Sequence, residues 1–130
     1  MLKFNYAHKE NFKWISVIRL PDFVTKEDFE WAVEEATKKK KTDFSKVEFL
    51  TYNERECVQC MHIGSYDDEP ATVALMHGYM ESQGYVLDIT DKRLHHEIYL
   101  SDARKVAPDK LKTVIRHPIK KNRNEATERI

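Results

Sequence analysis

Glycine and cysteine are scarce in this chain of 130 residues, and neither sign of charge predominates. With only three glycines, the sequence has no glycine-rich loop of the kind that cradles phosphates. Two cysteines are too few for a disulfide scaffold. The 22 basic and 22 acidic residues balance to a net charge of zero, whereas nucleic-acid-binding domains normally have a basic excess. We therefore expect neither a phosphate-loop enzyme nor direct binding to nucleic acid.

The N-terminus is equally short of apolar runs. It has the sequence MLKFNYAHKENFKW, which contains neither the core of a signal peptide nor a membrane-spanning helix. The balanced charge also gives no electrostatic reason for binding to a membrane surface. We therefore expect a cytoplasmic protein without a membrane partner, and its length suits one domain with a moderate core.

Hydrophobic periodicity predicts strands and helices along the chain. Residues 14–20 are β-branched and apolar, which favours a strand that ends at Pro21. Thr25 and Asp28 form an approximate capping box, so we expect a helix that begins there and closes with the cationic run 38–41. The apolar stripe of this helix is predicted to be Phe29, Ala32, Val33 and Ala36.

The remaining elements follow from the same patterns. Residues 67–69 are acidic and precede Pro70, as expected for the capped start of a second helix, and Gly84 suits its end. The buried face of this helix is predicted to be Thr72, Leu75, Met76, Tyr79 and Met80. A polar turn at 53–56 predicts a β-hairpin between the strands on either side of it. The strands expected after the first helix are 47–52, 57–63, 85–89, 94–100 and 112–117.

This order of elements predicts an α+β domain with a largely antiparallel sheet covered by helices on one face. A βαββ unit is clear from residue 47 onward and only partial before it. We expect one domain over residues 1–120, followed by a polar tail at 121–130 that is disordered.

Residues 94–101, which include the strand expected at 94–100, alternate with period two and carry the candidate site. Its more aliphatic face, expected to pack against helices, comprises Leu94, His96, Ile98 and Leu100. Glu97 and Tyr99 point together to the opposite face, about 6–7 Å apart along the strand, and His95 shares that face and can orient Glu97. In open water these are ordinary surface residues. In a cleft, the desolvated Glu97 would have a raised pKa or bind a cation, and Tyr99 would supply an aromatic wall and a hydroxyl.

The spacing of the cysteines disfavours metal and redox chemistry. Cys57 and Cys60 are three positions apart on an expected strand, so their thiols point to opposite faces, and His62 follows on the same strand. A redox pair would also need to lie at a helix N-terminus, where the dipole stabilises the thiolate. His77 and His117 have no evident partner at metal-ligand spacing. We therefore expect no metal and no cofactor.

Three segments carry a resemblance to a known family. They are LPDFVTKEDFEWAVEEATKKK, CVQCMHIGSYDDEPATVALMHGYMESQGY and HHEIYLSDARKVAPDKLKTVIRHP. With them, residues 15–120 resemble the GyrI-like small-molecule-binding domain, the ligand-binding fold of multidrug-responsive transcription regulators, which also occurs as stand-alone proteins. The resemblance implies two βαββ modules related by a pseudo-twofold axis, with an aromatic-lined cleft between them. It also implies that Glu97 corresponds to a cleft glutamate that meets cationic or planar aromatic ligands.

The resemblance further implies that the first module is incomplete. Only thirteen residues precede Trp14, and they do not resemble the strand and helix that full-length relatives carry there. A shortened module leaves sheet edges and apolar surface exposed, so we expect a homodimer. No DNA-binding domain is fused here, which disfavours direct transcription control.

Three functions stay open at this point. The first is a binding module for planar, hydrophobic or cationic xenobiotics, with Glu97 as its charged anchor. Its other contacts would be Tyr99, Tyr66, Trp14 and His95, although packing within the fold also accounts for the three aromatic residues. The second follows from stand-alone relatives that resemble cyclopropanoid cyclopropyl hydrolases, which implies a detoxifying hydrolase with Glu97 as general base on water and Tyr99 as hydrogen-bond donor. The third is a remnant or interaction subunit without a working cleft.

Overall fold

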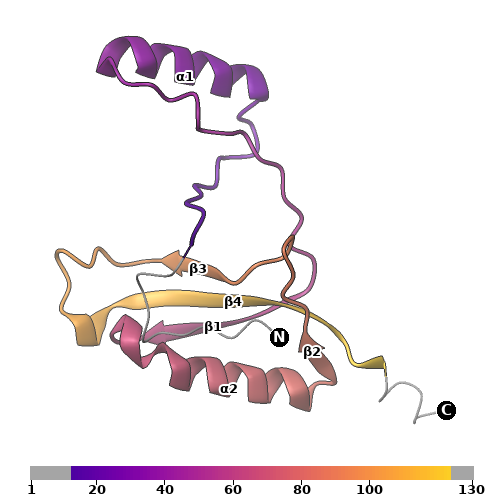
Figure 1. Ribbon diagram of the computed structural model, residues 1–130. Coiled ribbons are helices and arrows are strands. Elements are labelled where there is room, and N and C mark those ends of the chain that lie inside the picture. Colours follow the sequence, from indigo (N-terminus) through magenta and orange to yellow (C-terminus); the bar gives the residue numbers. More distant parts are fainter. Residues whose placement is uncertain (1–12, 124–130) are drawn as a thin grey trace. The chain divides into compact units, whose positions relative to one another are not determined.

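The computed structural model describes residues 13–123 of the chain and divides them into two compact units (Figure 1). We call residues 13–53 the helix unit and residues 54–123 the sheet unit. Each unit is described by itself below. Across the described residues, no helix combines the length and the apolar composition that crossing a bilayer requires.

The helix unit contains one helix, α1 (Lys26–Lys40), which begins as the sequence predicts. The backbone N–H of Thr25 donates to the Asp28 carboxylate at 2.9 Å, and the backbone N–H of Asp28 donates to the Thr25 hydroxyl at 3.1 Å. This reciprocal capping box satisfies two donors that a helix start otherwise leaves unpaired. The last turn carries three lysines, where cations complement the helix dipole. The predicted helix is therefore confirmed.

Burial along α1 is weaker than predicted. None of its residues is buried: Phe29 and Val33 are half-buried, and Ala32 is exposed. The ring of Phe29 lies 5.5 Å from that of Phe49, which is an aromatic contact within the unit. The prediction of a buried stripe is wrong for this unit because its described residues include no sheet against which the helix could pack.

Two predicted strands and a hairpin are absent from the helix unit. Residues 14–20 and 47–52 are irregular in the structure, although their β-branched composition favours strands. A strand needs hydrogen-bonded neighbours as well as propensity, and these segments have none in the described part of the unit. The expected turn at 53–56 contains Arg55 with a φ of 56° and joins the two units instead of two paired strands.

The sheet unit is built around one long central strand. It contains β1 (Cys57–Ile63), α2 (Glu69–Ser82), β2 (Tyr85–Leu87), β3 (His96–Tyr99) and β4 (Lys112–Lys121), with short 3-10 turns η2 (Tyr66–Asp68) and η3 (Pro108–Lys110). Strand β4 pairs antiparallel with each of the other strands, with β1 along one edge and β3 and β2 following each other along the other. The α+β class and the antiparallel sheet predicted from the sequence are thus confirmed.

Strand boundaries differ from the predictions in two ways. Strands β2 and β3 are shorter than expected, and β4 continues beyond its predicted end at His117 as far as Lys121. Pro118 does not stop β4, because its carbonyl accepts from the N–H of Asp88 at 2.9 Å and the next N–H, that of Ile119, donates to the Glu56 carbonyl. The extended β4 enters the expected tail at 121–130, of which residues 124–130 lie outside the described residues.

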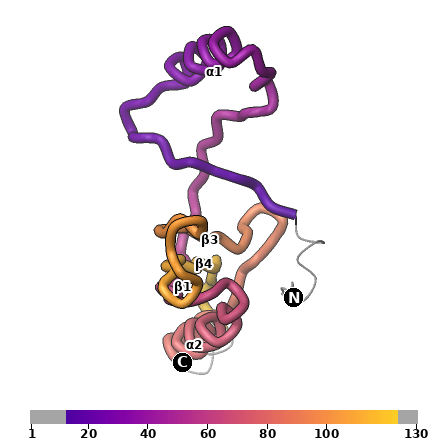
Figure 2. Tube along the Cα trace, turned by 90° about the vertical axis from the view of Figure 1, so that its left-hand side faces the viewer, coloured from indigo at the N-terminus to yellow at the C-terminus, as the bar shows by residue number. Residues whose placement is uncertain are grey.

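Helix α2 runs alongside β1 in both views and packs on one face of the sheet (Figures 1 and 2). The core between them comprises Val58, Met76, Met80, Ile115 and Ile119. Only part of the predicted helix face is buried: Leu75 and Tyr79 are exposed, so placing them in the core was wrong. Met76 and Met80, four residues apart, form a narrow contact stripe, and Leu75 and Tyr79 lie one position before each of them, away from it.

Two buried or half-buried arginines hold the first residues of the sheet unit. Arg93 is buried, forms an ion pair with Asp88, and donates to the carbonyls of Glu54 at 2.9 Å and Glu56 at 2.8 Å. Arg116 donates to both carboxylate oxygens of Glu54, at 2.9 and 2.8 Å. Such bidentate pairs fix geometry as well as charge. Residue 54 is therefore anchored through both its backbone and its side chain.

Candidate functional site

The register of β3 against β4 decides which way the candidate residues point. Glu97 lies opposite Ile115, and Tyr99 lies opposite Thr113. Directly opposed residues of an antiparallel pair project to the same face, and Ile115 belongs to the core under α2. His95, Glu97 and Tyr99 therefore share the face on which α2 packs. The prediction that the face with Ile98 packs against helices was wrong, because the strand is inverted relative to that expectation.

Glu97 stands at the centre of a group of polar contacts. His95 Nε2 donates to its Oε1 at 3.0 Å, and the Tyr99 hydroxyl donates to its Oε2 at 2.6 Å. Burial alone would raise the pKa of Glu97, but hydrogen bonds from His95, Glu69 and Tyr99 outweigh it and lower the pKa to about 2. Glu97 is thus an ionised, half-buried carboxylate at neutral pH, whereas a dry cleft by itself would have raised its pKa.

Tyr99 and Tyr66 form the outer rim of this group. Burial and the hydrogen bond to Glu97 raise the pKa of Tyr99, so its phenol stays protonated and donates. Its ring meets that of Tyr66, at the start of η2, edge to face with centroids 5.7 Å apart. Tyr99 is nevertheless 61% exposed. Four of the residues predicted to form the site, Glu97, Tyr99, Tyr66 and His95, therefore lie together in the structure.

Glu69 is a member of this group that sequence reasoning missed. The sequence predicts helix capping by residues 67–69, but Asp68, the N-cap residue of α2, makes no side-chain capping hydrogen bond, and Glu69 lies in the first turn of the helix. It is, however, only 1% exposed, and its carboxyl group lies within hydrogen-bond reach of Glu97. Two carboxyl groups that share a hydrogen bond hold a proton between them. A glutamate at a helix start gives no sequence signal that it is buried.

Two further histidines extend the group inward. His117 Nε2 and His95 Nδ1 are 2.5 Å apart, and His117 Nδ1 lies 2.8 Å from His77 Nε2 on α2. His117 is 2% exposed; burial, with neighbouring His95 and His77, lowers its pKa to about 3. Burial also lowers the pKa of His77. The only sequence signal for this pair is that His117 shares a face of its predicted strand with Ile115.

Trp14 lies in a different unit from the polar group around Glu97. It belongs to the helix unit and is largely exposed. Its role as a ligand contact stays a prediction.

The cysteines lie as their spacing predicted. Cys57 is opposite Pro118 and Cys60 opposite Ile115, so the two thiols are on different faces of β1, and both are free. Burial raises the pKa of the Cys57 thiol, which makes it less reactive. His62 contacts the Thr72 hydroxyl and the Ser65 carbonyl, each at 2.7 Å, and so ties β1 to the start of α2. Within residues 13–123, no three or more histidine, cysteine or acidic side chains are arranged to hold a metal ion.

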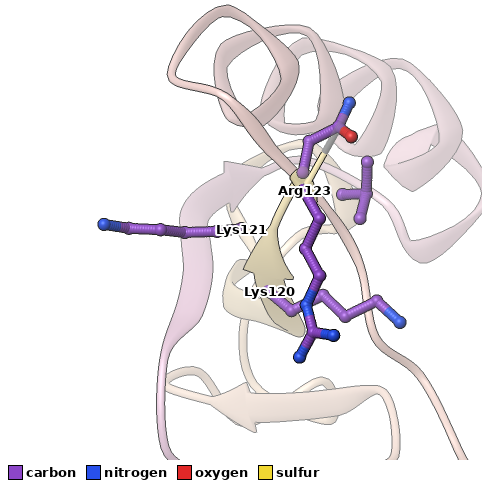
Figure 3. Close-up of a pocket in the computed structure, with 5 residues that line it drawn as sticks. Lys120, Lys121 and Arg123 are labelled. Carbon is purple, nitrogen blue, oxygen red and sulfur yellow. The ribbon is translucent and has the colours of Figure 1, made fainter. Parts of the chain in front are cut away.

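A shallow pocket lies elsewhere in the sheet unit, at the end of β4. It is lined by Val86, Lys120, Lys121, Asn122 and Arg123. Figure 3 shows Lys121 and Lys120 extending to opposite sides, with Arg123 running between them. The cations around this pocket diverge, and the pocket includes none of the predicted site residues.

Comparison with known proteins places this arrangement in a family. Residues 4–120 match the model of the GyrI-like small molecule binding domain. Among solved structures, a hydrolase from Listeria innocua is 50% identical with a TM-score of 0.74, and an uncharacterized conserved protein from the same organism is 51% identical with a TM-score of 0.75. Each comparison covers 78% of this chain, but 52% of the first protein and 50% of the second.

The chain therefore spans about half the length of these solved relatives. No curated protein matches it. The match to the family model extends over most of the sequence and includes every residue of the polar group around Glu97. The chain belongs to the GyrI-like small-molecule-binding domain family.

Proposed function

We propose that this chain binds planar, cationic small molecules and that Glu97 is their anchor. The observation that carries the proposal is a half-buried carboxylate that stays ionised at neutral pH beside two tyrosine rings. A partly desolvated negative charge attracts a cation more strongly than one in open water, and aromatic faces add cation–π and stacking contacts. His95 and the Tyr99 hydroxyl hold the carboxylate in place before a ligand arrives, which limits the ordering cost of binding.

A matched pair of ligands tests this proposal. N-methylacridinium is a permanent planar cation, and acridine is its neutral counterpart at pH 8. We expect wild-type protein to bind the cation in calorimetric titration and to melt at a higher temperature in its presence. Glu97→Gln should weaken binding of the cation at least about tenfold and change binding of acridine little.

The exposed turn variant Asp91→Asn controls for a general loss of negative charge and should bind as wild type does. Equal affinity of wild type and Glu97→Gln for the cation would remove Glu97 from the anchor role. An absence of binding across planar cations and neutral aromatics would favour the third function, a remnant or interaction subunit.

A hydrolase acting on strained, cyclopropane-bearing aromatic compounds is the second candidate. It is favoured by the Tyr99 hydroxyl held 2.6 Å from the Glu97 carboxylate at an exposed rim, and by the relative described as a hydrolase. In that reaction the water oxygen bonds to a ring carbon as the strained C–C bond breaks. Glu97 accepts a proton from the water, and solvent supplies a proton to the departing carbon.

The low pKa of Glu97 makes it a weak general base at neutral pH, so we rank this function second. Mass spectrometry of such a compound after incubation should reveal a product one water heavier if the chain is a hydrolase. Turnover that persists in Glu97→Gln would show that another group accepts the proton.

We also propose that the chain forms a homodimer. Within the described residues, β1 and β3 each pair with β4 alone, and Leu75 and Tyr79 of α2 are exposed. Unpaired edges and exposed apolar side chains favour self-association. Sedimentation velocity at several concentrations should give the mass of two chains, whereas a constant monomer mass would contradict the proposal.

A further inference from the structure

Three imidazoles form a continuous line that ends on Glu97. We call His77, His117 and His95 the histidine row. Their ring nitrogens are joined by contacts of 2.8 Å and 2.5 Å, and the last imidazole contacts Glu97 at 3.0 Å. The members come from α2, from β4 and from the residue directly before β3. His77, at the far end, is partly exposed, and His117, in the middle, is buried.

The hydrogen bonds specify where each proton lies. Because Glu97 is ionised, it can only accept, so His95 must carry its proton on Nε2. A neutral His95 then accepts on Nδ1, which requires a proton on Nε2 of His117. A neutral His117 with its proton on Nε2 accepts on Nδ1, so His77 must in turn carry its proton on Nε2. All three rings therefore hold the Nε2–H tautomer, and all donate in the direction of Glu97.

One added proton can cross this row without breaking a hydrogen bond. It binds Nδ1 of His77, whose Nε2 proton passes to Nδ1 of His117. The Nε2 proton of His117 then passes to Nδ1 of His95. His77 and His117 are left neutral as Nδ1–H tautomers, and His95 becomes an imidazolium that still donates to Glu97. Two protons move, one is taken up, and the new charge lies beside the carboxylate.

The surrounding charges favour this final position. Burial opposes charge on His77 and His117, as the lowered pKa of each indicates. Glu81 on α2 attracts positive charge to His77, and so helps a proton to arrive there. Glu97 faces His95 directly, with Glu69 on α2 and Tyr99 on β3 on its other sides. An imidazolium in contact with a carboxylate gains Coulomb energy that the two inner positions lack.

We propose that the histidine row conducts a proton from the surface at His77 to His95, where its charge competes with a cationic ligand for Glu97. The inference rests on the proposed function for its ligand but not for its proton chemistry. Binding of a cation at Glu97 then expels one proton through His77, and acidification releases the ligand. The site would thus sense pH through His77, a partly exposed residue of α2 that does not contact Glu97 itself.

Imidazole nitrogen NMR tests the row without any ligand. At pH 8 we expect the Nε2–H tautomer for all three histidines. On acidification, His95 should gain its second proton while His77 and His117 change to the Nδ1–H tautomer. A His77 ring that becomes an imidazolium while His117 keeps its Nε2 proton would overturn the proposal.

The pH dependence of N-methylacridinium binding tests the competition. For wild type, the dissociation constant should rise about tenfold for each pH unit below the titration midpoint of the row, because one proton leaves per ligand bound. His77→Phe should abolish this dependence, since the buried Nδ1–H of His117 would then lack an acceptor. His77→Gln should restore this equilibrium dependence, because the amide can rotate to present its oxygen as acceptor, although an amide cannot itself pass a proton inward.

His96→Gln is the matched control. His96 lies on the same strand but projects to the other face, where it contacts Glu54. It should leave the pH dependence unchanged. Full pH dependence in His77→Phe would overturn the relay. Failure of wild type to bind the cation at pH 8 would instead count against the proposed function. The NMR result would still show whether the histidine row takes up its proton at His95.

Discussion

Acid should destabilise the sheet unit through His117, and the size of the effect follows from its burial. An unfolded histidine has a pKa of about 6.5, whereas burial and its histidine neighbours lower the pKa of folded His117 to about 3. Below pH 6.5 the unfolded chain therefore binds a proton that the folded chain does not. The contribution of His117 to the free energy of unfolding is therefore constant above this pH. It falls as the pH decreases toward 3, by about 1.4 kcal/mol per pH unit.

At pH 5, His117 alone should lower the free energy of unfolding by about 2 kcal/mol relative to its value at pH 8. His117 is almost fully buried, so solvent screening reduces the effect little. The pKa of His77 is lowered as well, and its contribution has the same sign. The lowered pKa of Glu97 matters only below about pH 4.5, so it does not contribute between pH 5 and pH 8, and the comparison with a His117 variant removes what other groups contribute.

Hydrogen exchange of the β4 amides is the assay that reports this unit alone. Both tryptophans, Trp14 and Trp31, lie in the helix unit, so their fluorescence would follow the other part of the chain. After correction for intrinsic exchange rates, the free energy of opening should fall more steeply with acid in wild type than in His117→Phe. The difference in slope should be about 1.4 kcal/mol per pH unit. Parallel slopes would refute the argument, because they would mean that folded His117 binds its proton normally.

Three further outcomes follow from contacts described above. Thr25→Ala removes the capping box of α1 and should cost about 1 kcal/mol of helix stability, measured by chemical denaturation followed by tryptophan fluorescence. Ile115→Ala empties a fully buried core position and should cost about 2–5 kcal/mol by exchange of the β4 amides; a loss below 1 kcal/mol would contradict the assigned core. Tyr99→Phe removes one donor from Glu97, so carboxyl-carbon NMR should detect a rise in the pKa of Glu97, while an unchanged titration would show that the hydroxyl does not hold the carboxylate.

Much of the candidate site could be predicted from period-two alternation alone. The pattern correctly placed His95, Glu97 and Tyr99 on one face of a strand. It could not say which face meets the helix, because Ile98 and its aliphatic neighbours made the other side resemble a core. The pairing of Glu97 with Ile115 decides that question, and register between distant strands is not contained in local alternation.

The histidine row shows a second limit of a single sequence. Residues 77, 95 and 117 are separated by about twenty positions each, and none has a partner at a recognised spacing. Their proximity comes from α2 lying against the sheet and from the antiparallel pairing of β3 with β4. The strands predicted at 14–20 and 47–52 failed for a related reason, since propensity supplies no pairing partner.

The anchoring of Glu54 also has a mechanical consequence. Its backbone carbonyl is held by Arg93 and its carboxylate by Arg116, directly after the boundary between the units. A force that reaches Glu54 from the preceding residues is resisted by two guanidinium groups, that of Arg116 in β4 and that of Arg93 in the turn before β3. Because Arg116 belongs to β4, a load on Glu54 is passed directly to the central strand of the sheet and not to the edge strand β1 alone.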